Sequence, residues 1–178
     1  MIWRILKTNF LTVIVAFFFL AAGCGYHFSP AGDHIDKRLE TVFVDNFSNN
    51  TSEANVENYF RNSFIDQFRK GSRFKLVNSK NLADTVLKGS INSLVTPHLA
   101  YSASKLAKEN RVTVTMEVVF EERETKKIIW ANKNLSENED YLVDESNPNT
   151  TETNRTTALK KLAEDTAEKT YRYIMSGF

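Results

Sequence analysis

Cys24 has the most distinctive chemistry in the sequence, because it is the only cysteine among 178 residues. A thiol can bind a metal, form a disulfide, react as a nucleophile or be covalently modified. A single cysteine excludes an internal disulfide, and no C-x-x-C pair or Cys/His cluster has the spacing of a structural zinc site. The surroundings of Cys24 must therefore indicate its role.

The segment before Cys24 is typical of a secretory signal. Arg4 and Lys7 lie near the N-terminus, and an almost unbroken apolar run occupies residues 10–22. This run is shorter than the roughly 20 residues that a transmembrane helix needs to cross a bilayer. We therefore predict that residues 1–23 are a signal peptide rather than a membrane span.

The end of this segment indicates a lipid attachment site. Ala21, Ala22 and Gly23 are small enough for a signal peptidase, and their spacing to Cys24 resembles a bacterial lipobox, with Leu20 one position further away than in the commonest pattern. We predict that Cys24 receives a diacylglycerol and becomes the first mature residue. Two or more acyl chains, at about 0.8 kcal/mol per buried CH₂, would hold the protein on a membrane. The alternatives are cleavage near Ala22, or an uncleaved anchor with Cys24 as a small buried residue.

The charge balance and the absence of several motifs exclude other functions. The chain has 23 basic and 22 acidic residues, so it lacks the broad positive field that would attract nucleic acid. It contains no G-x-S-x-G, H-E-x-x-H, P-loop or G-x-G-x-x-G motif. His27, His34 and His98 have no convincing companion for a metal site. We therefore predict no enzyme activity, no metal and no cofactor, with a periplasmic hydrolase built from scattered residues as the distant alternative.

Apolar residues that alternate with polar ones predict several strands after the cysteine. The expected strands are residues 40–44, 73–78, 84–95, 111–121 and 126–135. In the strand at 84–95, Gly89 is expected to mark a bulge or close packing. Residues 97–110 and the acidic, Asn-rich residues 137–153 are expected to be loops.

Two segments have the spacing of amphipathic helices. The first is expected to begin at an N-cap on Ser52 and to end at Gly71. Its apolar stripe consists of Val56, Phe60, Phe64 and Phe68. The second is expected over residues 152–175, with an apolar face formed by Leu159, Leu162, Ala163, Thr166, Thr170, Tyr173 and Ile174.

This order of elements predicts an α+β fold, a two-layer sandwich. The sheet is expected to be mainly antiparallel or mixed, with four to five strands and two helices packed on one face. Its other face, which would contain Thr113, Thr115, Glu117 and Glu121, is expected to be polar and open to a partner. The predicted organisation is a signal peptide at 1–23, an acylated tether at 24–39 and a single domain at 40–178.

Three basic residues are candidates for binding an anionic ligand. Lys105, Lys108 and Arg111 lie in or beside the expected loop at 97–110, where a binding tip could project. Phosphate or carboxylate groups on a lipid head would be suitable partners for them. The alternative is that they form part of an ordinary solvated surface.

The segments together resemble the LPS-assembly lipoprotein family, LptE, over essentially the whole chain after the signal. The resemblance begins with Cys24-Gly25-Tyr26-His27-Phe28 at the lipidation site. It continues through Val42-Phe43-Val44, Asn46-Phe47, Asn50-Thr51, Phe74-Lys75-Leu76-Val77, Ala83-Asp84, Leu87-Lys88-Gly89-Ser90-Ile91, Val112 to Phe120, Trp130 and the C-terminal helix. The agreement of order and length carries most of the weight.

The resemblance implies an outer-membrane lipoprotein that sits within the β-barrel LptD as a plug and supports its assembly. Together they would place lipopolysaccharide in the outer leaflet, so the implied partners are LptD, lipopolysaccharide and the membrane, without nucleic acid. Gly25 is not the aspartate that retains lipoproteins at the inner membrane of enteric bacteria, which is consistent with delivery to the outer membrane on its periplasmic or barrel-lumen face. Lys105, Lys108 and Arg111 are candidate lipopolysaccharide contacts from local chemistry alone.

Another cell-envelope lipoprotein adaptor is the principal alternative. It would be a peptidoglycan-synthase activator or a secretion-pore component. An activator that reaches across the periplasm would need a long Pro-rich or disordered linker, and only Pro30 precedes the first expected strand.

Overall fold

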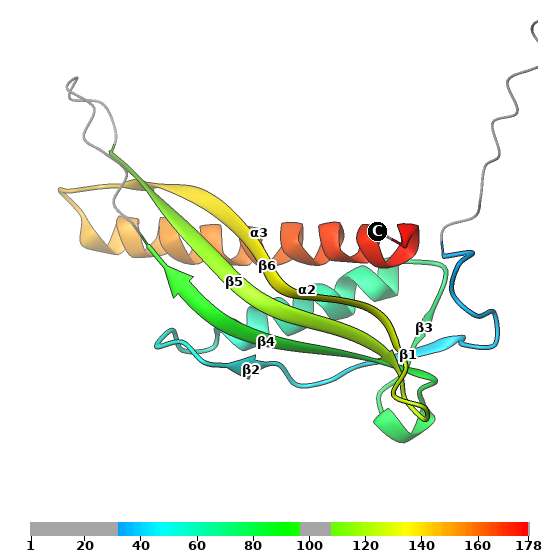
Figure 1. Cartoon of the computed structure of the whole chain (residues 1–178). Helices are drawn as coiled ribbons and strands as arrows, with labels where there is room; N and C mark the ends of the chain where they lie inside the picture. Colours follow the sequence, from blue (N-terminus) through cyan, green and yellow to red (C-terminus); the bar gives the residue numbers. More distant parts are fainter. Residues whose placement is uncertain (1–31, 97–107, 178) are drawn as a thin grey trace, which may run out of the picture. The chain divides into compact units, whose positions relative to one another are not determined.

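Alternating apolar residues on long strands and apolar stripes on two helices build a two-layer α+β fold, as predicted (Figure 1). The computed structural model describes residues 32–96 and 108–177. The described elements follow in the order β1 (Thr41–Val44), β2 (Ser48–Asn49), α2 (Val56–Lys70), β3 (Lys75–Leu76), the 3₁₀-helix η1 (Lys80–Leu82), β4 (Thr85–Val95), β5 (Lys108–Glu122), β6 (Ile128–Val143) and α3 (Pro148–Ser176).

The sheet is mixed and has six strands among the described residues. Its order is β3-β1-β4-β5-β6, and β2 pairs with β4 beside this path. The short strand β1 pairs in parallel with β3 and with β4, and the short strand β2 pairs in parallel with β4. The long strands β4, β5 and β6 form an antiparallel meander. The strand missed by the sequence pattern is β2, whose two residues are too few to show an alternation.

The core lies between one face of the sheet and both helices. Every second residue of β5 from Val112 to Phe120 is buried, as the alternation predicts. The stripe of α2 is also confirmed, because Phe60, Phe64 and Phe68 are fully buried and the Phe68 ring lies 5.9 Å from that of Phe120. On α3 the predicted apolar face is buried except at Tyr173, which is 40% exposed.

The start of α2 differs from the prediction. The helix begins at Val56, and its N-cap is Asn55, which has a left-handed backbone conformation and no side-chain capping bond. Asparagine tolerates this conformation better than most residues do. The predicted end is confirmed, because the Gly71 amide donates a hydrogen bond to the Gln67 carbonyl oxygen.

The prediction of a loop over residues 137–153 is wrong. The strand β6 continues to Val143, and α3 begins at Pro148. The polar residues Glu137 and Glu139 remain in the strand because Lys169 and Lys161 of α3 pair with them at 2.6 and 2.7 Å. The helix begins early because the Asn147 side chain accepts hydrogen bonds from two amides of its first turn.

Residues 32–39, which the sequence suggested as part of a tether, pack on the domain. Ile35 and Leu39 are buried in the core. The Gly32 amide donates a 2.7 Å hydrogen bond to the Met175 carbonyl oxygen, and Arg73 donates to the Leu39 carbonyl oxygen. The chain between Cys24 and Gly32 therefore spans at most roughly 29 Å at full extension.

The two ends of the long strands differ in what they carry. We call the end with residues 32–40, η1 and the β5–β6 turn the anchor end, because the described chain begins there, eight residues after the predicted lipid anchor Cys24 (Figure 1). We call the other end, where β4 stops and β5 starts, the loop end. The 15 residues of β5 join them, which is about 50 Å at a rise of roughly 3.3 Å per residue.

Candidate functional site

Two of the three candidate basic residues, Lys108 and Arg111, lie at the loop end. Lys108 is the first residue of β5 and stands opposite Val143 of β6 in the strand register. Lys105 and the expected lipidation site Cys24 lie outside the described residues. Arg111 is the one candidate whose side-chain contacts are described.

Arg111 forms a forked ion pair with Asp140 on the neighbouring strand. The Arg111 Nε atom donates to Asp140 Oδ1 at 2.6 Å, and an Nη2 hydrogen is donated to Oδ2 at 2.9 Å. This contact holds the pKa of Asp140 below its ordinary value and raises that of Arg111. Both side chains are about 40% exposed, so solvent screens the pair. An anionic ligand can reach Arg111 only in competition with Asp140.

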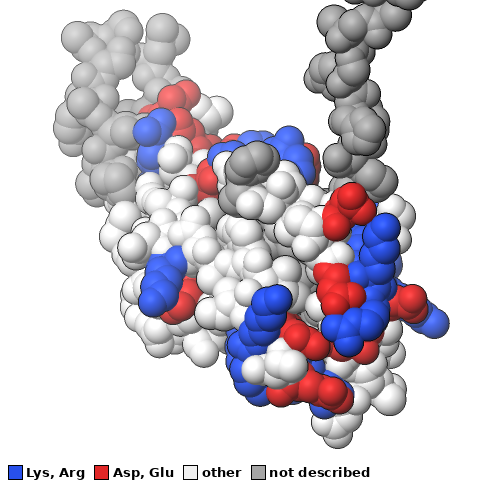
Figure 2. Space-filling model, turned by 45° about the vertical axis from the view of Figure 1, so that its right-hand side comes forward, with Lys and Arg blue, Asp and Glu red and all other residues white. Residues whose placement is uncertain are grey.

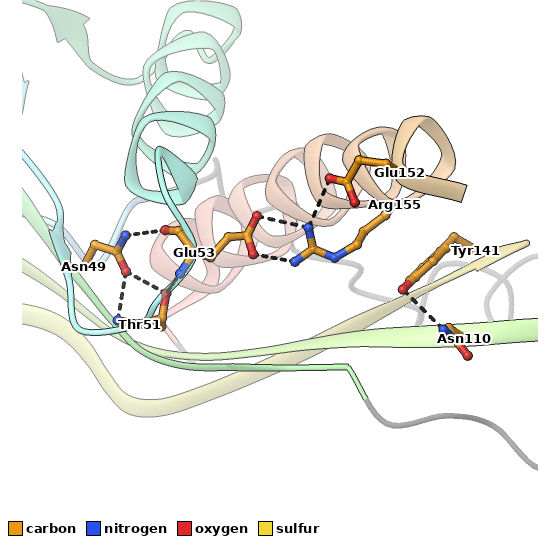
Figure 3. A network of polar contacts seen from close by, with 7 residues as sticks. All are labelled: Asn49, Thr51, Glu53, Asn110, Tyr141, Glu152 and Arg155. Atoms are coloured by element: carbon orange, nitrogen blue, oxygen red, sulfur yellow. Dashed lines mark hydrogen bonds and ion pairs between the residues drawn. The ribbon is translucent and has the colours of Figure 1, made fainter. Parts of the chain in front are cut away.

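A polar network fixes the elements that surround the loop end (Figure 3). Arg155, in the second turn of α3, forms an ion pair with Glu53 in the loop before α2. The backbone of that loop is held by Asn49, whose Nδ2 atom donates to the Glu53 carbonyl oxygen at 2.7 Å. On the strands, Asn110 donates to the Tyr141 hydroxyl at 3.4 Å. No sequence motif predicted this network, because Glu53 and Arg155 are 102 residues apart and Asn110 and Tyr141 are 31 residues apart.

Charges on the described surface are mixed rather than gathered in a patch of one sign. On the face that Figure 2 displays, basic and acidic side chains are interspersed. Arg73 has a structural role, because it donates to the Leu39 and Asp36 carbonyl oxygens and lies 4.6 Å from the centre of the Phe74 ring. In residues 32–96 and 108–177, no group of three or more His, Cys, Asp or Glu side chains could hold a metal ion.

The face of the sheet away from the helices is rich in hydroxyl and amide side chains, as predicted. Thr113 and Thr115 of β5 are partly exposed on this face. Their neighbours across the strands continue the polar surface; they are Asn138 and Ser136 on β6 and Ser93 on β4. Glu117 stands opposite Ser90 in the same band. The expectation for Glu121 is wrong, because this residue is only 7% exposed and its carboxylate pairs with Lys88 at 2.7 Å. This polar face extends across three strands and offers donors and acceptors without a strong net charge.

A groove between β6 and the C-terminal half of α3 was not anticipated. It has a volume of about 440 Å³, and its walls include Trp130, Asn132, Asn134, Ser136, Glu137 and Tyr173. The sequence placed Trp130 only as a strand residue and Tyr173 in the core. A groove of this kind depends on the packing of two elements that are far apart in sequence.

The family model for lipopolysaccharide assembly, LptE, matches residues 39–174. This match covers more than half of the chain and includes every described strand. The chain belongs to the LptE family. The resemblance seen in the sequence is therefore confirmed, and the chain is a lipopolysaccharide-assembly lipoprotein of the LptE family. No curated protein sequence matches the chain significantly.

Solved structures of two proteins described as lipoproteins have the LptE-like fold seen here. Lipoprotein B from Nitrosomonas europaea is similar with a TM-score of 0.53 and 10% identity, over 78% of this chain and 84% of that one. A lipoprotein structure from Caulobacter crescentus is similar with a TM-score of 0.50 and 11% identity, over 74% of this chain and 89% of that one. At such low identity these likenesses establish the fold alone. None of the helices in the described residues has the length and apolar character required to cross a bilayer.

Proposed function

We propose that this chain is an outer-membrane lipoprotein, anchored through Cys24, that forms a plug-like complex with the β-barrel LptD. In this complex it supports the assembly of the barrel and the insertion of lipopolysaccharide into the outer leaflet. The observation that carries the proposal is the family match, which extends over all described strands and most of α3. The lipobox-like sequence at Cys24 supports the anchor.

The polar face of the sheet supports a contact with the inside of a barrel. Residues that face the lumen of a transmembrane barrel are polar, because they alternate along each strand with residues that face lipid. Thr113 and Thr115 on β5, Ser136 and Asn138 on β6, and Ser93 on β4 present the matching chemistry over three strands. A surface of short hydroxyl and amide side chains can hydrogen-bond to such a wall and still separate from it during assembly.

The proposed organisation places the anchor and the candidate lipopolysaccharide contacts at opposite ends. Residues 1–23 are removed, residues 24–31 lead from the acylated cysteine, and the domain comprises the expected residues 40–178 together with the packed residues 32–39. Lys108 and Arg111 then lie about 46 and 36 Å along β5 from its last residue, Glu122, given a rise of roughly 3.3 Å per residue. This separation would allow the basic residues to act inside a barrel while the acyl chains stay in the membrane.

Purification of the protein with its native lipid anchor tests this proposal. We expect a large outer-membrane β-barrel to co-purify. Thr115→Lys places a charge in the middle of the polar face and should reduce the yield of barrel at least severalfold. Thr157→Lys is the matched control, because Thr157 is exposed on α3. Recovery of peptidoglycan synthases without any barrel would instead favour the alternative adaptor function.

A further inference from the structure

The groove between β6 and α3 combines two aromatic rings with amide and hydroxyl groups. Tyr173 contributes from α3 and is 40% exposed, and Trp130 contributes from the first part of β6. Asn132, Asn134 and Ser136 also line the groove. The volume of about 440 Å³ is within the usual range for sites that bind small molecules.

An irregularity in β6 shapes one wall of this groove. Met116 of β5 pairs with Leu135, but Val118 pairs with Asn132, so Lys133 and Asn134 are inserted opposite Glu117. Such bulges bend a strand and redirect its side chains, and they are frequent beside binding sites. The Asn134 amide donates a 2.9 Å hydrogen bond to Asn132 Oδ1, which fixes this turn at the wall of the groove.

The charge in the groove is compensated. Glu137 is the acidic residue of the wall, and its Oε2 atom accepts a 2.6 Å hydrogen bond from Lys169 Nζ. This contact raises the pKa of Lys169, so its ammonium group stays charged at neutral pH beside the Glu137 carboxylate. The remaining polar groups that line the groove are neutral, and therefore the groove does not have the chemistry to select a phosphate or another anion.

We propose that this groove binds a neutral saccharide ring. A sugar ring has an apolar C–H face, which packs on an aromatic side chain, and a rim of hydroxyl groups that both donate and accept hydrogen bonds. Trp130 and Tyr173 supply the aromatic surfaces, and the amide groups of Asn132 and Asn134 supply matching donors and acceptors. Ser136 belongs to both the groove and the polar face proposed to contact a barrel, but the aromatic wall of Trp130 and Tyr173 lies outside that face, so the groove adds a ligand class rather than restating that contact.

Tryptophan fluorescence gives a direct test, because Trp130 is the only tryptophan left once residues 1–23, which contain Trp3, are removed. The mature protein is purified in a detergent without a sugar headgroup and titrated with two probes. One is a β-1,4-linked N-acetylglucosamine trimer, which represents the glycan of the cell wall; the other is a delipidated, dephosphorylated oligosaccharide from lipopolysaccharide. We expect a saturable change in Trp130 emission with one of them, and the probe that binds identifies the source.

Substitutions in the groove provide the second measurement. Tyr173→Ala should weaken binding about tenfold or more, whereas Tyr173→Phe keeps the ring and should retain most of the affinity. Asn134→Ala should also weaken binding, and its matched control is Asn138→Ala, which removes an exposed amide from the polar face. Thermal melts and co-purification of the barrel should not change for Tyr173→Ala, which separates this proposal from the proposed function. Lack of a Trp130 response to both probes at millimolar concentration, or wild-type binding by Tyr173→Ala, would overturn it.

Discussion

The guanidinium group of Arg155 forms a two-point ion pair with the carboxylate of Glu53, which lies 102 residues earlier in the chain. The Nη1 group of Arg155 donates to Glu53 Oε1 at 3.0 Å and also lies 3.4 Å from the Glu152 carboxylate. The side chains of Arg155 and Glu53 are only 19% and 27% exposed. The pair therefore joins the start of α3 to the loop that leads into α2, in a region where solvent screens it only partly (Figure 3).

Arg155→Ala should lower the free energy of unfolding by about 1–3 kcal/mol, because Glu53 would keep a partly buried charge without its main partner. Urea denaturation followed by circular dichroism measures this change. Arg172→Ala is the control: Arg172 is exposed and lies 3.9 Å from Glu168, so its loss should cost less than about 0.5 kcal/mol. Equal effects of the two substitutions would show that the Arg155 pair does not stabilise the fold.

The close approach of Phe47 to Gly89 gives a second prediction. A Cβ atom on Gly89 would lie 2.5 Å from the Phe47 ring, which also packs 5.4 Å from the ring of Phe64. Gly89→Ala should therefore destabilise the protein by about 1–3 kcal/mol through overpacking. In a Phe47→Leu background the same substitution should cost clearly less, because the smaller side chain leaves room. Ser93→Ala, on the open face of β4, is the control and should have little effect on the unfolding midpoint.

Local patterns predicted the elements whose sequence signal is repeated several times. The five buried residues of β5 and the aromatic stripe of α2 each repeat at the expected period, so their burial follows from the sequence. The close packing at Gly89 was also predicted, although the irregularity of β4 itself lies between Ile91 and Ser93. Patterns of this kind need no knowledge of distant contacts.

Contacts between distant segments account for what the sequence did not reveal. Glu137 and Glu139 indicated a loop because their partners, Lys169 and Lys161, are on a helix that had not yet been placed. The pairing of Arg111 with Asp140 depends on the register of β5 and β6, which an inserted bulge alters. The groove beside Tyr173 was missed for the same reason, since its walls come from two elements.

Asp84 predicts a pH dependence of stability. Burial alone would raise its pKa, but hydrogen bonds from the Thr41 hydroxyl and from the Glu40 and Thr41 amides outweigh burial, so its pKa lies below the ordinary value. The depressed pKa means that the stabilising contribution is complete above the unfolded pKa of about 3.9 and is lost as the pH falls through the folded pKa.

Asp84→Asn should thus cost about 1–2 kcal/mol at pH 7, because a neutral acceptor replaces a charged one. The difference from wild type should shrink as the pH falls below about 4, where wild-type Asp84 also becomes protonated. Urea denaturation between pH 2.5 and 7 measures it. Asp66→Asn, at an exposed position on α2, controls for the change in net charge. A difference that stays constant over this pH range would contradict the role given to the ionised carboxylate.

The lipid anchor proposed at Cys24 can be tested without disturbing the domain, because the described core begins eight residues later. Cys24→Ala should give a folded protein with an unchanged melting temperature that no longer incorporates labelled palmitate and leaves the membrane fraction. Ser29→Ala, in the same segment, is the control and should behave like wild type. If Cys24→Ala remains in the membrane and is processed normally, lipidation at this residue is wrong.

Removing the carboxylate that pairs with Arg111 should strengthen lipopolysaccharide binding, whereas reversing the charge of the nearby lysines should weaken it. Lys105→Glu combined with Lys108→Glu should weaken lipopolysaccharide binding about tenfold, since charge-assisted hydrogen bonds contribute about 1.5–3 kcal/mol. Asp140→Asn removes the carboxylate that competes for Arg111 and should strengthen binding about two- to fivefold, the equivalent of an exposed ion pair. Asp165→Asn on α3 makes the same change in charge away from the loop end. Binding that is unaffected by both loop-end variants would remove this end of the sheet as the lipopolysaccharide contact.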